Sequence, residues 1–149
     1  MTQSFRLESG GLINRDKKIS FKFNGKNYFG YEGDTLASAL IANGVHLIGR
    51  SFKYHRPRGI YTCGIEEPNA LVQILSEHNE PNTRATIKRI YDGMEISSQN
   101  RWPSLRFDFG AINNILSPIF SAGFYYKSFM GPKGFGKIFT NRSLENRLD

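Results

Sequence analysis

Hydrophobic and polar residues alternate most clearly in the segment Lys18–Phe23. Alternation with a period of two is typical of a β-strand that buries one face. Asn24-Gly25 follows at once, and both residue types tolerate the positive φ angles of a type I′ turn. The pattern therefore predicts a hairpin whose second strand is Lys26–Tyr31. The buried face of its first strand would consist of Ile19, Phe21 and Phe23.

Helical spacing of apolar residues replaces this alternation after the hairpin. Gly33 breaks the strand, and Asp34-Thr35 supplies an N-cap whose side-chain oxygen can accept a hydrogen bond from a free helix N–H. Asn43-Gly44 ends the pattern, with Gly44 suited to the left-handed position after a helix. A short amphipathic helix is therefore predicted across the hairpin. Its apolar residues are Leu36, Ala37, Ala39, Leu40 and Ile41.

The next segments alternate between irregular and strand-like patterns. Arg50–Cys63 shows no hydrophobic period, and Pro57 and Gly59 indicate a loop with a rigid corner. Ala70–Leu75 predicts a buried strand, and Ser76–Asn82 predicts a polar turn.

A second hairpin is predicted around Asp92-Gly93, between Ala85–Tyr91 and Met94–Ser98. The order hairpin, helix, long loop, strand, hairpin is that of the β-grasp fold. This is an α+β architecture with a mixed sheet and one helix across its face. We assign residues 18–99 to this domain and residues 1–17 to an N-terminal arm.

Residues 100–149 form an extension rich in aromatic residues, glycine and proline, with little regular period. Short helices are predicted at Ile112–Leu116 and Ile138–Leu148. So many rings with so little scaffold favour a segment that buries them on another surface, because monomers rarely expose a large apolar patch. The alternative is that the extension wraps its own domain.

Composition limits the classes of protein that fit. The chain has 149 residues, of which 39% are hydrophobic, so it supports one modest core. Its formal charge of +7 fits a nucleic acid, an anionic lipid, an acidic protein partner or simply a lysine-rich solvated surface. No apolar run is long enough to span a bilayer, and no signal-peptide pattern opens the chain. A single cysteine excludes an internal disulfide and favours a cytoplasmic setting.

Cys63 is the residue with the clearest metal or redox chemistry. A [2Fe–2S] centre takes four protein ligands, usually cysteines, and the chain has no other cysteine. His46, His55 and His78 do not fall at a recognisable ligand spacing. A structural or incidental cysteine is favoured over an activated thiolate beside Arg58.

A basic loop follows the predicted helix, and its cations alternate with aromatic rings. Such a set suits a partner chain, a cofactor phosphate or, with less support, nucleic acid. A solvated loop paired with Glu66 or Glu67 is the alternative, and these two acids are predicted to form a solvated turn before Pro68. The loop consists of Arg50, Phe52, Lys53, Tyr54, His55, Arg56 and Arg58.

Catalytic patterns are absent from the sequence. The stretch Gly131–Gly136 lacks the order of a phosphate-binding loop, and its glycines are interpreted as turn residues. No Ser-His-Asp set, paired carboxylates or HExxH motif is present. The residues alone therefore predict a cytoplasmic binding or assembly domain, and no catalytic residue is assigned.

Several long motifs, in order, resemble the N-terminal region of the alpha subunit of heterotetrameric sarcosine oxidase. They are GDTLASALIANGV, GRSFKYHRPRGIYTCGIEEPNALV, EPNTRAT, YDGMEISSQNRWPSL and SAGFYYKSFM, between about Gly11 and Met130. This resemblance implies a ferredoxin-like β-grasp domain related to small [2Fe–2S] subunits. Those relatives place cluster cysteines after a PRG-like corner, where this chain has only Cys63. The cluster is therefore expected to be lost.

The resemblance also implies a function within a complex. Sarcosine oxidase demethylates sarcosine oxidatively with FAD, FMN and NAD, and tetrahydrofolate accepts the one-carbon unit. We expect no cofactor in this chain alone, and we expect its partners to be the other subunits or the dinucleotide-binding part of such a complex. The substrate could equally be dimethylglycine or another N-methyl amine. Since the sequence stops at Asp149 before any G-x-G-x-x-G fingerprint, it is either the product of a split gene or a truncated piece.

The predicted role is therefore assembly. The basic loop, through Arg50, Lys53, Tyr54, His55, Arg56 and Arg58, would contact a cofactor or a partner chain. The extension would dock on the partner through Trp102, Phe124, Tyr125, Tyr126 and Phe129. The alternative is a small ferredoxin-like electron-transfer or binding subunit of an amino-acid dehydrogenase. Contact with a membrane is not expected, and nucleic acid is the less favoured partner.

Overall fold

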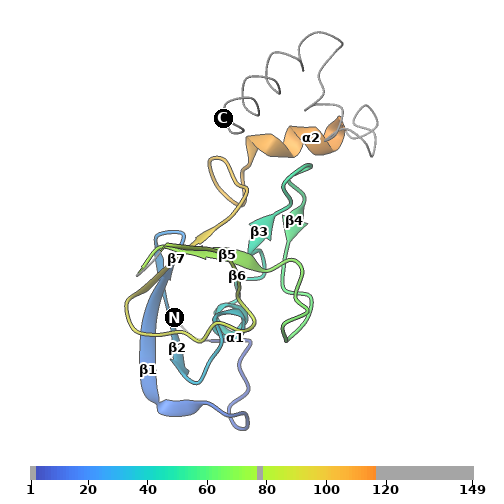
Figure 1. Cartoon of the computed structure of the whole chain (residues 1–149). Helices are drawn as coiled ribbons and strands as arrows, with labels where there is room; N and C mark the ends of the chain where they lie inside the picture. Colours follow the sequence, from blue (N-terminus) through green and yellow to red (C-terminus); the bar gives the residue numbers. More distant parts are fainter. Residues whose placement is uncertain (1–2, 77–78, 117–149) are drawn as a thin grey trace, which may run out of the picture. The chain divides into compact units, whose positions relative to one another are not determined.

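The computed structural model describes residues 3–76 and 79–116, in which five strands form a mixed sheet (Figure 1). The sheet has the strand order β2-β1-β7-β5-β6, and one helix, α1, packs against it. A separate two-stranded ribbon joins β3 to β4. This is the predicted α+β, β-grasp arrangement. Residues up to Ile112 form one compact unit and residues from Asn113 a second, and the sites described below lie in the first.

The predicted first hairpin is confirmed. Strands β1 (Asn14–Phe23) and β2 (Lys26–Glu32) pair antiparallel, with Phe23 opposite Lys26. Asn24 and Gly25 have φ angles of 51° and 76°, as a type I′ turn requires. Strand β1 begins earlier than predicted, because Asn14 pairs with Glu32 across an irregularity in the ladder.

Helix α1 (Leu36–Ala42) begins and ends where the sequence indicates. The side chain of Thr35 accepts a hydrogen bond from the backbone N–H of Ser38, which confirms the N-cap. At the other end Gly44 has a φ of 73°, and the N–H groups of Gly44 and Val45 donate to the carbonyls of Ile41 and Leu40. This pair of bonds is the Schellman motif, in which glycine is favoured at the left-handed position.

The second predicted hairpin is wrong in its pairing. Strand β7 (Met94–Ser98) lies between β1 and β5, parallel to β1 and antiparallel to β5 (Leu71–Ile74). The antiparallel partner on the other side of β5 is β6 (Glu80–Arg84), so β6 begins within the segment predicted as a polar turn. The buried strand predicted at Ala70–Leu75 is confirmed as β5.

The segment Ala85–Tyr91 forms no strand because its carbonyl groups bind the helix. The N–H groups of Leu36 and Ala37, in the first turn of α1, donate to the carbonyls of Lys88 and Ala85 at 2.8 Å each. The first N–H groups of a helix have no partner within the helix, so an external acceptor is needed. The carbonyls of Ala85 and Lys88 are therefore bonded to α1 and are not available for pairing within a hairpin.

The core lies between α1 and the sheet. Its largest fully buried apolar side chains come from strands, helix and the segment after the helix: Phe21, Leu36, Leu40, Ile48, Val72, Ile74, Met94 and Ile96. The segment before β1 is tied to this core by Arg6, whose guanidinium lies 2.6 Å from the buried carboxylate of Asp34. Among the described residues no helix is long and apolar enough to cross a membrane.

The predicted loop contains one short ribbon of two strands. Strands β3 (Gly49–Arg50) and β4 (Pro57–Arg58) pair antiparallel, so the loop predicted without regular structure closes as a small hairpin. After β7 the chain forms the 3-10 helix η1 (Phe109–Ala111) and the helix α2 (Ile112–Ile115), close to the predicted helical turn. The predicted terminal helix at Ile138–Leu148 lies outside the described residues.

Candidate functional site: the basic loop and the loop of Glu67

The basic loop divides into residues that face the protein and residues that face solvent. Arg56 and Arg58 are exposed, whereas the Arg50 side chain is only 8% exposed. Two cations lie near the ring of Tyr54, with Lys53 Nζ and Arg56 Cζ each 4.8 Å from its centroid. Cation–π contacts of this kind contribute about 0.5–1 kcal/mol each at exposed sites.

A buried carboxylate, that of Asp108, holds the inward-facing residues. Its Oδ2 lies 2.7 Å from His55 Nδ1 and 3.3 Å from Arg50 Nε. Its Oδ1 accepts hydrogen bonds from the backbone N–H groups of Trp102 and Gly110. Burial alone would raise the pKa of Asp108, but the hydrogen bonds from His55 and the backbone outweigh it and the pKa lies below its ordinary value. Asp108 thus joins the loop to the segment after β7.

Arg50 also joins the basic loop to the segment after β7. Its Nε and Nη2 donate to the carbonyl of Leu105 at 2.9 and 2.6 Å, and its Nη1 donates to the carbonyl of His55 at 2.7 Å. The predicted contact residues Arg50 and His55 are therefore engaged within the domain. Arg56 and Arg58 are exposed, Lys53 is half-buried, and Arg58 also donates to Asn69 Oδ1.

Aromatic rings gather on the surface beside this network, and we call them the aromatic cluster: Trp102, Phe107 and Phe109. The ring centroids of Trp102 and Phe109 are 5.1 Å apart, and those of Phe107 and Phe109 are 5.0 Å apart. All three rings are more than half exposed. Trp102 was predicted as a docking residue. The other predicted docking residues, Phe124, Tyr125, Tyr126 and Phe129, lie outside the described residues.

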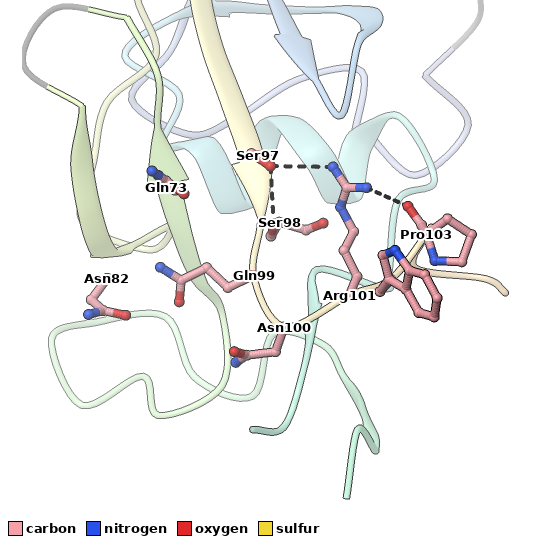
Figure 2. A pocket seen from close by; sticks show the side chains of 9 residues that line it. Gln73, Asn82, Ser97, Ser98, Gln99, Asn100, Arg101 and Pro103 are labelled. Atoms are coloured by element: carbon pink, nitrogen blue, oxygen red, sulfur yellow. Dashed lines mark hydrogen bonds between the residues drawn. The ribbon is translucent and has the colours of Figure 1, made fainter. Parts of the chain in front are cut away.

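A shallow polar hollow of about 580 Å³ borders Trp102 (Figure 2). Carboxamides of Gln73, Asn82, Gln99 and Asn100 line it, together with Arg101, which donates to the carbonyl of Pro103 at 2.9 Å. None of the described residues that line it is a carboxylate, histidine or cysteine. Its amide, hydroxyl and guanidinium groups supply the donors and acceptors to contact a polar surface.

Glu67 corrects the prediction of a solvated acidic turn. Glu66 is exposed as predicted, but Glu67 is only 1% exposed. Its Oε2 accepts from the backbone N–H groups of Tyr61 and Thr62 at 2.8 and 2.6 Å. Its Oε1 accepts from those of Asn69 and Ala70 at 2.7 and 3.1 Å.

The charge of Glu67 is stabilised by backbone dipoles. Within the described part of the chain no cation pairs with its carboxylate. Burial acts to raise its pKa, and the four backbone hydrogen bonds outweigh burial, so the pKa lies below its ordinary value. One carboxylate therefore closes the loop of residues 61–70.

Comparison with known proteins gives the class of this chain. Residues 16–101 match the family described as 2Fe-2S iron-sulfur cluster binding domain, and the chain belongs to that family. Within it, the chain is 61% identical over 130 residues to sarcosine oxidase subunit alpha of Rhizobium meliloti (strain 1021). It is 40% identical over 90 residues to sarcosine oxidase subunit alpha of Corynebacterium sp. (strain U-96).

These matches cover much of the chain and little of its relatives. The first covers 87% of this chain and 13% of the relative, and the second covers 58% and 9%. The crystal structure of L-proline dehydrogenase from P. horikoshii matches with a TM-score of 0.49 and 30% sequence identity. That match covers 60% of this chain and 17% of the other.

The residues of this chain do not fit the iron–sulfur cluster that the family name implies. The whole sequence contains one cysteine, and Cys63 is exposed, whereas a [2Fe–2S] centre needs four protein ligands. No group of three or more His, Cys, Asp or Glu residues is placed to hold a metal among the described residues. Backbone N–H groups on both sides of Cys63 bind the carboxylate of Glu67 instead.

Proposed function

We propose that this chain is a structural and assembly domain of a sarcosine oxidase-type flavoprotein oxidoreductase, with no catalytic role of its own. The observation that carries the proposal is the loop of residues 61–70. In a chain of a cluster-binding family, this loop contains the single cysteine and is closed by Glu67. A rigid domain without a redox group can still present a surface to a partner.

The surface proposed for that contact consists of Arg56, Arg58 and the aromatic cluster. Asp108 holds the two parts in one arrangement, because it binds His55 of the loop and the backbone of Trp102. Exposed tryptophan and arginine side chains are enriched among the residues that dominate protein interfaces. Pre-ordering lowers the entropy cost of docking. Identity of 61% to a sarcosine oxidase alpha subunit supports a flavoprotein of that type as the partner.

The cofactors of the complex belong to this proposal as well. FAD, FMN and NAD would lie in the partner chains, with tetrahydrofolate as the one-carbon acceptor, and this chain would hold none of them. Its setting would be the cytoplasm, without contact with a membrane. A nucleic-acid partner has less support, because Arg50 and His55 of the basic loop are engaged with Asp108.

Co-purification tests the proposal. The tagged chain is expressed in its own host, purified, and its absorption spectrum is recorded together with the masses of the chains that accompany it. A flavin spectrum with larger subunits is the expected result. A colourless monomer would overturn the proposed assembly role. Iron–sulfur charge-transfer bands would instead favour the electron-transfer alternative and contradict the role given to Glu67.

A further inference from the structure

A second cavity, of about 330 Å³, lies at one end of the sheet. Strands β1 and β7 run parallel, so their carboxyl ends meet at the same edge. Asn24, after β1, fixes this edge by accepting hydrogen bonds from the N–H and hydroxyl of Ser98 at 2.8 and 3.0 Å. The β1–β2 turn, the segment after α1 and the segment after β7 form the walls. The volume lies in the range of small-molecule pockets, about 300–1,000 Å³.

The rim of this cavity is positively charged. Lys26, Arg101 and Arg106 line it, and the described residues of its wall include no aspartate or glutamate. Lys26 and Arg106 are exposed, and in the described part of the chain neither forms an ion pair or a side-chain hydrogen bond. Among the described residues, Arg101 donates to the uncharged oxygens of Pro103 and Ser97, and its buried Nε has no acceptor.

The floor of the cavity is apolar. Phe23 and Leu105 are buried there, and Tyr28 and Leu47 are half-buried beside them. An apolar floor under a cationic rim suits a ligand with an apolar body and an anionic group, since each part then meets its complement. We propose that this cavity is a binding site for a small organic anion, a carboxylate, sulfonate or phosphate ester with a flat apolar body. The inference does not depend on the proposed assembly role.

Anilinonaphthalene sulfonate is a probe of this chemistry. Its binding to the full chain is followed by fluorescence titration, with the uncharged N-phenylnaphthylamine as the matched neutral probe. We expect saturable binding of the sulfonate at one site, weaker at high salt because ions screen an exposed rim. We expect the neutral probe to bind at least about tenfold more weakly, a difference of about 1.4 kcal/mol. Equal affinity for the two probes would overturn the proposal, because the exposed aromatic cluster would explain it.

Two double variants locate the site. Lys26→Gln with Arg106→Gln removes two rim charges, and we expect it to weaken sulfonate binding at least about tenfold. Lys18→Gln with Arg89→Gln removes the same charge outside the cavity wall and is expected to change the affinity less than about twofold. In amide NMR spectra the probe should shift the signals of Val45, Ser104 and Leu105. Equal losses in both double variants, or shifts confined to Trp102, Phe107 and Phe109, would contradict the assignment.

Discussion

Nδ1 of His55 lies 2.7 Å from Oδ2 of Asp108, a carboxylate whose side chain has no exposed surface. The two residues are 53 positions apart, and their contact joins the basic loop to the segment that carries Trp102. The proposed docking surface exists as one unit because of this contact. Disruption of this contact should therefore lower the stability of the domain and loosen the proposed docking surface.

The first prediction concerns Asp108→Asn. The variant keeps the shape of the side chain and removes the charge that Arg50 and His55 face, and breaking a buried ion pair costs about 3–5 kcal/mol. We expect the free energy of unfolding, measured by urea denaturation at pH 7, to fall by about that amount. Asp16→Asn is the matched control, because Asp16 is exposed and should change stability by less than about 0.5 kcal/mol. Equal stability of the two variants would show that Asp108 does not hold the loop.

Gly110→Ala provides a steric test of the same connection. A Cβ atom at this position would lie 2.3 to 2.6 Å from three atoms of the His55 ring, so the ring must move. We expect a loss of about 1–3 kcal/mol in the free energy of unfolding, the usual cost of overpacking. Gly49→Ala is the control, since its nearest contacts would be ordinary at 3.7 and 3.8 Å. A His55 ring signal unchanged in NMR spectra of Gly110→Ala would contradict the predicted clash.

Glu67→Gln tests the closure of the loop by a carboxylate. Oε1 and Oε2 both accept backbone N–H groups, so an amide nitrogen on either side would face a donor. Hydrogen bonds to charged groups contribute about 1.5–3 kcal/mol each, and we expect the variant to lose about 2–4 kcal/mol of stability. Glu66→Gln, one residue away and exposed, should lose less than about 0.5 kcal/mol. Equal losses of stability in Glu67→Gln and Glu66→Gln would show that Glu67 lies in a solvated turn, as the sequence predicts.

Stability should also fall in acid, and the pKa values give the direction. Glu67 and Asp108 have folded-state pKa values below their ordinary values of 4.5 and 3.8. The stability that they contribute is complete above those ordinary values and is lost as the pH falls through the folded-state pKa values. We expect the free energy of unfolding to decline below about pH 5. A double variant, Glu67→Gln with Asp108→Asn, should decline less steeply, and an unchanged slope would mean that other carboxyls govern the acid response.

Local signals account for what the sequence predicts correctly. The alternation before Asn24-Gly25 and the caps Thr35 and Gly44 act within a few residues of the elements they define. The predicted second hairpin does not form, because the carbonyls of Lys88 and Ala85 accept hydrogen bonds from the first turn of α1, about fifty residues earlier in the chain. The sequence of Ala85–Tyr91 contains no pattern that indicates these hydrogen bonds to α1. Strand propensity and the Asp92-Gly93 turn therefore predicted a hairpin there.

The candidate site is less visible in the sequence for the same reason. Two adjacent acids before a proline indicate a solvated turn, and the burial of Glu67 depends on backbone N–H groups, which every sequence has. The role of Asp108 depends on His55, and no spacing rule links positions so far apart. The cationic and aromatic composition of the basic loop was visible, but the division into inward Arg50 and His55 and outward Arg56 and Arg58 required the structure.

The outward residues lead to the last prediction, for the double variant Arg56→Ala with Arg58→Ala. Both side chains are exposed, and their local contacts include the ring of Tyr54 and the carboxamide of Asn69. Such surface contacts contribute little to folding, so the free energy of unfolding should change by less than about 1 kcal/mol. If the loop contacts a partner chain or a cofactor, the yield of co-purified subunits and their flavin content should fall. Lys18→Ala with Arg89→Ala removes the same charge elsewhere and should preserve both, whereas an unchanged yield and flavin content in the loop variant would exclude the basic loop from assembly.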